Sequence, residues 1–203
     1  MILRLISGFI LGPVVIAFIL IGGYYFNLVL FLVFLFCILE IKNLKKNSLK
    51  FVILLILILF VFCSYDIAHS LNGNFIVLYL MILSWSSDIG GYIFGKIIGG
   101  KKINIISPNK TFSGFFGSII FAQLFALLIN SMNMQNLLNE LILKPYFVFF
   151  CTIVIIVGDL AFSYIKRLSN IKDFSNIIPG HGGLFDRIDG LIFLVIFVFI
   201  SNL

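Results

Sequence analysis

The sequence predicts an all-α, polytopic transmembrane bundle of about seven spans, and three observations support that fold class. Of the 203 residues, 62% are hydrophobic and 11% are charged, whereas a soluble domain is about half apolar and about a quarter charged. The apolar residues form long uninterrupted runs, which do not alternate as the strands of a membrane barrel do. Lys and Arg residues gather between these runs on one side. Lipid is therefore expected to be part of the solvent of this chain.

A membrane-spanning helix needs about 20 mostly apolar residues. The segments that approach or reach this length are 2–21, 24–39, 51–65, 75–94, 112–131, 145–164 and 184–203. The second and third are short, so they are expected to be tilted or extended at their ends. No boundary of a soluble domain is visible, and residues 1–203 are predicted to form a single integral membrane domain.

The placement of basic residues predicts the orientation of the bundle. Thirteen of the fourteen Lys and Arg residues fall on one side if the N-terminus is cytoplasmic, and only Lys144 falls on the other. Because basic loops stay in the cytoplasm, this agreement supports seven spans and a cytoplasmic N-terminus. The longest polar loops, 95–111 and 165–183, then face the cytoplasm and are where chemistry is expected. The net charge of +6 has no nucleic-acid-binding motif beside it, so a nucleic-acid partner is not expected.

Two carboxylates are predicted to lie at membrane depth. Asp88 is placed at the cytoplasmic end of the fourth span, and Asp159 in the later part of the sixth. An ionisable group near the bilayer centre costs at least about 2.5 kcal/mol, so such residues usually have a function or a specific partner. Their shared position near two basic loops favours a common site over two separate helix-packing contacts.

The densest charged segment follows the sixth span and mixes both signs. Its charged residues and histidine are Lys166, Arg167, Lys172, Asp173, His181, Asp186, Arg187 and Asp189. A loop that only contacts anionic lipid heads would be basic throughout. Carboxylates bind Mg²⁺, and Lys and Arg neutralise phosphate oxygens. The mixture therefore indicates a site for both metal ions and phosphates.

Two local patterns agree with phosphate chemistry. Asp186 and Asp189 are three residues apart and would share one face at the start of the last helix, where the helix N-terminus also favours anionic ligands. Gly182 and Gly183 precede them in a turn that lets a ligand approach the backbone. The other loop supplies Lys110 and Thr111, a pair suited to phosphate, although the glycine spacing of a P-loop is absent.

The segment from Ser163 to Asp189 resembles the signature of the phosphatidate cytidylyltransferases, also called CDP-diacylglycerol synthases. Stretches 88–91 and 107–111 resemble two further landmarks of that family in the expected order, so the resemblance covers roughly residues 84–189. Two features depart from the family pattern: Ser113 stands where an acidic residue is common, and the chain is short. The matching residues read Ser163-Tyr164-Ile165-Lys166-Arg167, Lys172-Asp173-Phe174-Ser175 and Ile178-Pro179-Gly180-His181-Gly182-Gly183-Leu184-Phe185-Asp186-Arg187-Ile188-Asp189.

The resemblance implies a metal-dependent nucleotidyltransferase of phospholipid biosynthesis, which converts CTP and phosphatidic acid into CDP-diacylglycerol and pyrophosphate. It implies Mg²⁺ as cofactor, with a second cation allowed, and a homodimer. The compact size of the chain suggests a bacterial plasma membrane, and the basic loops predict an active site on the cytoplasmic side. Asp159, Asp186 and Asp189 are the expected metal ligands. Lys166, Arg167 and Arg187 join them as catalytic residues. The expected substrate-binding residues are Asp88, Lys110, Thr111, Lys172, Asp173, His181, Gly182 and Gly183.

Other functions stay open from the sequence. An ion-coupled transporter would explain Asp88 and Asp159, but not the charged segment 166–189, and no inverted repeat is visible. Another CTP-using lipid enzyme, such as a polyprenol or lipid-alcohol kinase, would share the nucleotide and the membrane. A CDP-alcohol phosphotransferase would carry a different array of aspartates, which is absent. An inactive structural relative can be excluded only by activity.

Overall fold

The computed structural model describes residues 2–103, 110–132, 137–138, 140–175, 177 and 182–201, with side chains from residue 12 onward. The described part of the chain is helical and contains no strand; an isolated bridge pairs Lys102 with Thr111. The prediction of an all-α fold is therefore confirmed. Backbone groups in lipid must find partners within the protein, and a helix satisfies them within its own segment.

A helix lies at each of the seven predicted spans, and a short additional helix precedes the sixth. Helices α2, α3, α4, α5 and α7 are long and apolar enough to cross a membrane, while α8 has 16 residues. The bounds are α1 (Ile2–Ile21), α2 (Gly23–Ile41), α3 (Asn47–His69), α4 (Gly73–Ile97), α5 (Phe112–Ser131), α6 (Glu140–Leu143), α7 (Pro145–Leu168) and α8 (Phe185–Ile200).

Two helices extend beyond the predicted spans in ways that matter for the site. Helix α7 continues to Leu168, so Lys166 and Arg167 lie in its last turn and not in the following loop, where the sequence analysis placed them. Cations are favourable there because the C-terminal end of a helix carries partial negative charge. Helix α2 runs on to Ile41 and thereby includes Glu40.

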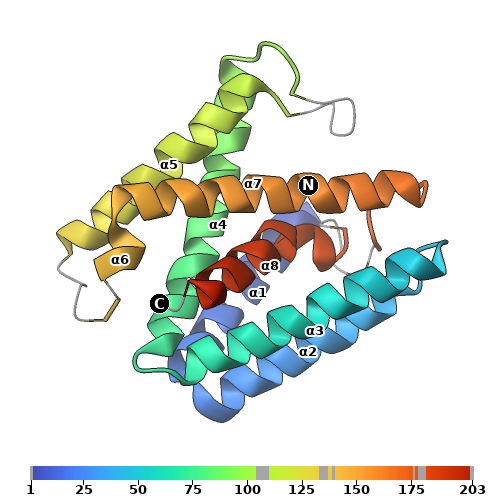
Figure 1. The fold of residues 1–203 in the computed structure, drawn as a ribbon, viewed down its shortest axis with the longest axis horizontal. Helices are drawn as coiled ribbons and strands as arrows, with labels where there is room; N and C mark the ends of the chain where they lie inside the picture. Colours follow the sequence, from blue (N-terminus) through green and yellow to red (C-terminus); the bar gives the residue numbers. More distant parts are fainter. Residues whose placement is uncertain are drawn as a thin grey trace.

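Helix α8 occupies the middle of the bundle. It packs against α7, α3 and α4, and Figure 1 shows it between α7 and the antiparallel pair α2 and α3. The same view places the end of α7 and the turn between α2 and α3 on one side of the molecule. Many large apolar side chains lie on the outside of the bundle, including Phe31, Phe62 and Leu124. Such a surface suits lipid, because lipid tails are as apolar as these side chains.

Helices α4 and α5 pack against each other more extensively than any other pair, and glycines make this contact possible. A Cβ on Gly90 would lie 2.4 Å from the carbonyl oxygen of Gly117, and one on Gly114 would lie 2.8 Å from that of Gly91. The backbones of the two helices therefore touch directly, as small residues allow in membrane helices. This contact holds Asp88, on α4, beside the residues at the start of α5.

Replacing Gly117 with alanine is expected to destabilise the protein by about 1–3 kcal/mol, the usual cost of inserting a methyl group into a packed core. The new Cβ would lie 2.4 Å from Phe94 Cβ and 2.6 Å from the Gly90 carbonyl oxygen. The measurement is the fraction of monodisperse protein that survives heating in detergent. Gly12→Ala is the control, since nothing lies within 4 Å of a Cβ there. Equal heat resistance of the two variants would contradict the packing argument.

Candidate active site

Asp159 and Lys110 form an ion pair that joins two distant parts of the chain. Asp159 lies on α7, and Lys110 directly precedes Thr111 and the start of α5. The hydroxyl of Ser163 also points to Asp159, 3.5 Å from its Oδ1. Both partners are about a quarter exposed, at 24% for the lysine and 27% for the aspartate. Two predicted site residues from separate motifs therefore meet.

A pocket of about 320 Å³ surrounds this ion pair. It lies among α4, α5 and α7, and its polar lining includes Asp88, Lys110, Thr111 and Asp159, all of which were predicted to belong to the site. Thr111 also begins α5: its Oγ1 accepts a hydrogen bond of 3.1 Å from the Gly114 amide, the usual role of an N-cap residue. Tyr92, Phe115 and Ile156 supply apolar walls. A small polar ligand group could enter here beside an apolar chain.

Asp88 and Asp159 line the pocket, and a third carboxylate, Asp189 of α8, lies close enough to interact with both electrostatically. Asp159 repels both Asp88 of α4 and Asp189 of α8 electrostatically. Lys110 and Arg187 offset the charge of Asp88, and Lys166 offsets that of Asp189. Oxygen ligands of this kind are those that Mg²⁺ prefers. Among the described residues, however, no three acidic, histidine or cysteine side chains already converge as metal ligands. The donors fit Mg²⁺ in their chemistry, and the predicted ligand set stays a prediction.

Asp186 is held by protein donors on both of its oxygens. Its Oδ1 receives the ammonium of Lys166 at 2.6 Å, and its Oδ2 accepts from the amides of Phe174 at 3.0 Å and Gly183 at 3.2 Å. The pair is largely shielded, with side-chain exposures of 10% for Lys166 and 8% for Asp186. Asp186 therefore links the end of α7, the loop after it and the start of α8.

The remaining predicted residues are mostly at the surface. Arg167, Lys172, Asp173 and Arg187 are exposed, and Arg167 donates to the carbonyl of Ile171 at 3.3 Å. Gly182 has a φ of +85°, a backbone conformation that glycine adopts without strain. His181 and residues 107–109 of the other loop lie outside the described residues. The basic side chains on this surface are accessible to anionic ligands from the solvent.

Ser113, the departure from the family pattern, has a structural role at the start of α5. Its hydroxyl donates to the carbonyl of Gly99 and lies 2.9 Å from Thr111 Oγ1. These contacts connect the segment after α4 to the N-terminus of α5. A hydroxyl at this position therefore helps to fix Thr111, which follows Lys110 directly.

Glu40 was missed by the sequence analysis. Its side chain is fully buried, and it accepts hydrogen bonds from Ser175 Oγ at 2.6 Å and from the amides of Leu184 at 2.7 Å and Phe185 at 2.9 Å. Nearby, Asn43 donates to the Phe174 carbonyl at 2.8 Å. The signal in the sequence was a single acid at the end of an apolar run, just beyond the predicted boundary of that span.

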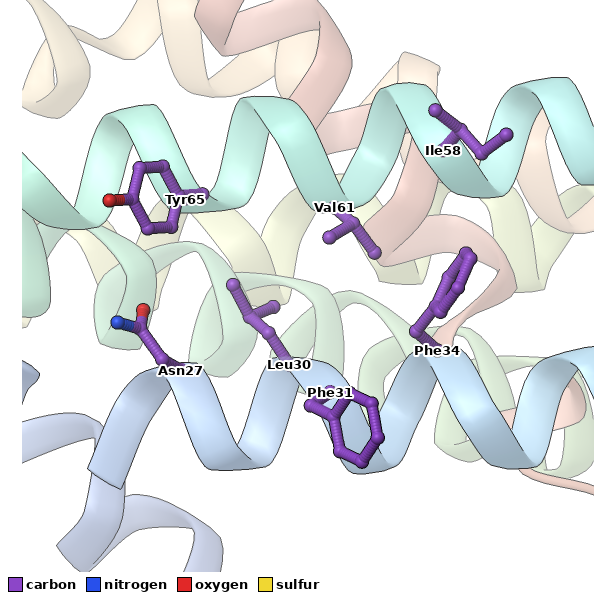
Figure 2. Close-up of a pocket in the computed structure, with 7 residues that line it drawn as sticks. All are labelled: Asn27, Leu30, Phe31, Phe34, Ile58, Val61 and Tyr65. Atoms are coloured by element: carbon purple, nitrogen blue, oxygen red, sulfur yellow. The ribbon is translucent and has the colours of Figure 1, made fainter. Parts of the chain in front are cut away.

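A second hollow lies between α2 and α3 and is apolar along most of its length. It measures about 430 Å³, and Figure 2 shows the Asn27 amide and the Tyr65 hydroxyl at one end, with Leu30, Val61 and Phe34 beyond them. Asn27 Oδ1 is buried without a hydrogen-bond partner among the described residues. None of the predicted site residues lines this hollow.

The chain is similar in sequence to known proteins of one family. The model of the cytidylyltransferase family matches residues 46–202. A phosphatidate cytidylyltransferase of Rickettsia bellii is 34% identical over 98% of this chain and 90% of its own length. Proteins of the same name from Haemophilus influenzae and Bacillus subtilis are 37% and 36% identical, over 59% and 61% of this chain. Those two matches cover 43% and 45% of the relatives' own lengths. The Rickettsia bellii relative aligns with almost all of this chain, and the family model matches most of the chain's residues. This chain therefore belongs to the cytidylyltransferase family.

Proposed function

We propose that this chain catalyses the formation of CDP-diacylglycerol and pyrophosphate from CTP and phosphatidate, a step of phospholipid biosynthesis. Relatives named phosphatidate cytidylyltransferase support this reaction, one of them over almost the whole chain. The observation that carries it furthest is the Lys110–Asp159 ion pair inside a polar pocket of an otherwise apolar bundle. Opposite charges in such a pocket suit a phosphate together with its counter-ion.

The reaction requires alignment and charge neutralisation more than covalent help from the protein. A phosphate oxygen of phosphatidate forms a bond to the α-phosphorus of CTP. The bond from that phosphorus to the oxygen that bridges the α- and β-phosphates breaks, and this oxygen leaves with pyrophosphate. Phosphatidate is already anionic, so the nucleophile needs no base. Lys110, Lys166 and Arg187 are proposed to hold phosphate oxygens, with Arg167 and Lys172 at the surface. Preorganised cations of this kind stabilise the charge of the transition state.

Mg²⁺ is the proposed cofactor. When bound, it would neutralise phosphate charge and fix the orientation of the triphosphate. Asp159 and Asp189 are proposed as its ligands, and Asp88 shares the pocket with Asp159. Asp186 was predicted as a ligand together with them, and its bonds to Lys166 and two backbone amides support an additional role in ordering the site.

The proposed location is a bacterial plasma membrane, with the N-terminus and the active site on the cytoplasmic side. The one-sided distribution of Lys and Arg supports this orientation, and CTP is a cytosolic substrate. A homodimer is proposed from the family resemblance. Light scattering in detergent, corrected for bound detergent, would test the oligomeric state.

Chelation is expected to lower the rate of purified protein by at least about 100-fold, because a bound metal supplies several kcal/mol of transition-state stabilisation. The assay uses labelled CTP and phosphatidate in detergent, with EDTA and then with added Mg²⁺. Product identity separates the candidate enzymes: CDP-diacylglycerol with pyrophosphate supports the proposal, whereas CDP with a phosphorylated lipid alcohol indicates a kinase. Folded protein that gives neither product across several lipids and metals would refute the proposed function.

A further inference from the structure

We propose that Glu40 is a positioning residue for the reaction: from α2 it holds the start of α8 and the preceding loop, and thereby the site residues Asp186 and Lys166. This inference rests on the proposed function. It concerns a residue outside the segment 46–202 that matches the family model. Glu40 is fully buried and accepts from a side chain and two backbone amides of the protein, so its effect on the reaction would pass through the residues that it orients.

The first argument is the number and origin of the donors to this carboxylate. Ser175 Oγ and the Leu184 amide donate to Oε1 at 2.6 Å and 2.7 Å, and the Phe185 amide donates to Oε2 at 2.9 Å. A fully buried charge is costly unless several hydrogen bonds satisfy it. Ser175 and Leu184 belong to the segment between α7 and α8, and Phe185 is the first residue of α8, so this region and Glu40 stabilise each other.

The second argument is that α8 has no cap of its own. Leu184 stands at its N-cap position and makes no side-chain capping bond, since an aliphatic side chain has no acceptor. The first amides of a helix need partners, and negative charge is favourable beside them. Glu40 supplies both from another helix. Removing its charge would therefore loosen the first turn of α8, which carries Asp186 and leads to Asp189.

The third argument is the short path from Glu40 to Asp186. Gly183 lies between them: a Cβ there would be 2.9 Å from Asp186 Oδ2 and 3.0 Å from Glu40 Oε2. The Gly183 amide donates to Asp186, as does the amide of Phe174. Asn43, two residues after the end of α2, donates to the Phe174 carbonyl. The end of α2 thus supports the same backbone that orients Asp186.

Glu40→Gln is the test variant, because it keeps the size of the side chain and removes the charge and one acceptor. We expect kcat to fall by about 10-fold to 100-fold, the effect of a small misplacement of reacting groups. KM for CTP and for phosphatidate should change by less than about threefold, since the binding groups themselves remain. Glu140→Gln, the same change at an exposed glutamate of α6, is the matched control and should leave both constants unchanged.

Hydrogen exchange gives a readout that does not depend on activity. In Glu40→Gln, peptides covering 182–190 should exchange faster, while peptides from α4 and α5 should not change. Faster exchange with unchanged kcat would overturn the positioning role, and so would a lower kcat without faster exchange. If Glu40→Gln does not fold, Ser175→Ala is the second variant, because it removes only one donor to Glu40. It should lower kcat by a smaller factor and speed exchange in the same peptides. A normal kcat with normal exchange in Ser175→Ala would overturn the positioning role. Wild-type activity, measured in parallel, separates this inference from the proposed reaction.

Discussion

Asp186→Asn is expected to abolish CDP-diacylglycerol formation, with a loss in kcat of at least about 10³-fold, near the upper end for removal of a preorganised electrostatic group. The substitution removes the charge that faces the shielded ammonium of Lys166 at 2.6 Å. Both carboxylate oxygens of Asp186 accept hydrogen bonds, Oδ1 from Lys166 and Oδ2 from two backbone amides. In asparagine, an NH₂ group replaces one of these oxygens and cannot accept. The site then loses its order and a predicted metal ligand together. Labelled CTP turnover measures the effect.

The same variant should also lose stability, by about 3–5 kcal/mol, because one partner of a buried ion pair is left alone. The double variant Lys166→Met with Asp186→Asn separates stability from catalysis. It should recover much of the heat resistance, since no unpaired charge remains, and still show no activity. Lys101→Ala is the surface control, as this side chain is exposed, and it should retain wild-type turnover. Substantial turnover by Asp186→Asn would exclude a required role for this carboxylate.

Asp159→Asn is expected to lower kcat by about 10²–10³-fold, again the range for loss of one preorganised electrostatic group. The carboxylate pairs with Lys110 and lies in the polar pocket with Asp88. Without its charge, Lys110 would lose its fixed position, and a proposed metal ligand would be missing. The measurement is the Mg²⁺ dependence of turnover, which should shift to higher concentration.

Stability should respond differently in this variant. The lost ion pair is partly exposed, and such pairs contribute at most about 1 kcal/mol. The change also relieves repulsion of Asp159 with Asp88 and Asp189. Heat resistance should therefore stay close to that of the wild type while activity falls. A protein that unfolds early, or one that keeps its rate and Mg²⁺ dependence, would contradict the proposed role of Asp159.

The pairing of Lys110 with Asp159 illustrates how far sequence reasoning reached at the site. Asp159 was predicted to belong to it because an acid in an apolar helix needs an explanation, and Lys110 because it stands beside Thr111 in a loop suited to phosphate. Their direct contact depends on how α5 and α7 pack, which hydropathy does not contain. Lys166 shows the same limit: the sequence placed it in a loop, whereas α7 extends past it and shields it beside Asp186.

By itself, the sequence determined the fold class, the positions of the long helices and the charged segments of the site. Apolar length sets these features locally, and α5 begins and ends where the apolar run does, at Phe112 and Ser131. Only the tertiary structure decided that Glu40 caps α8 from α2, through donors more than 130 residues away along the chain. That contact arises because packing brings separate helix ends together, and no local pattern of residues records which ends will meet.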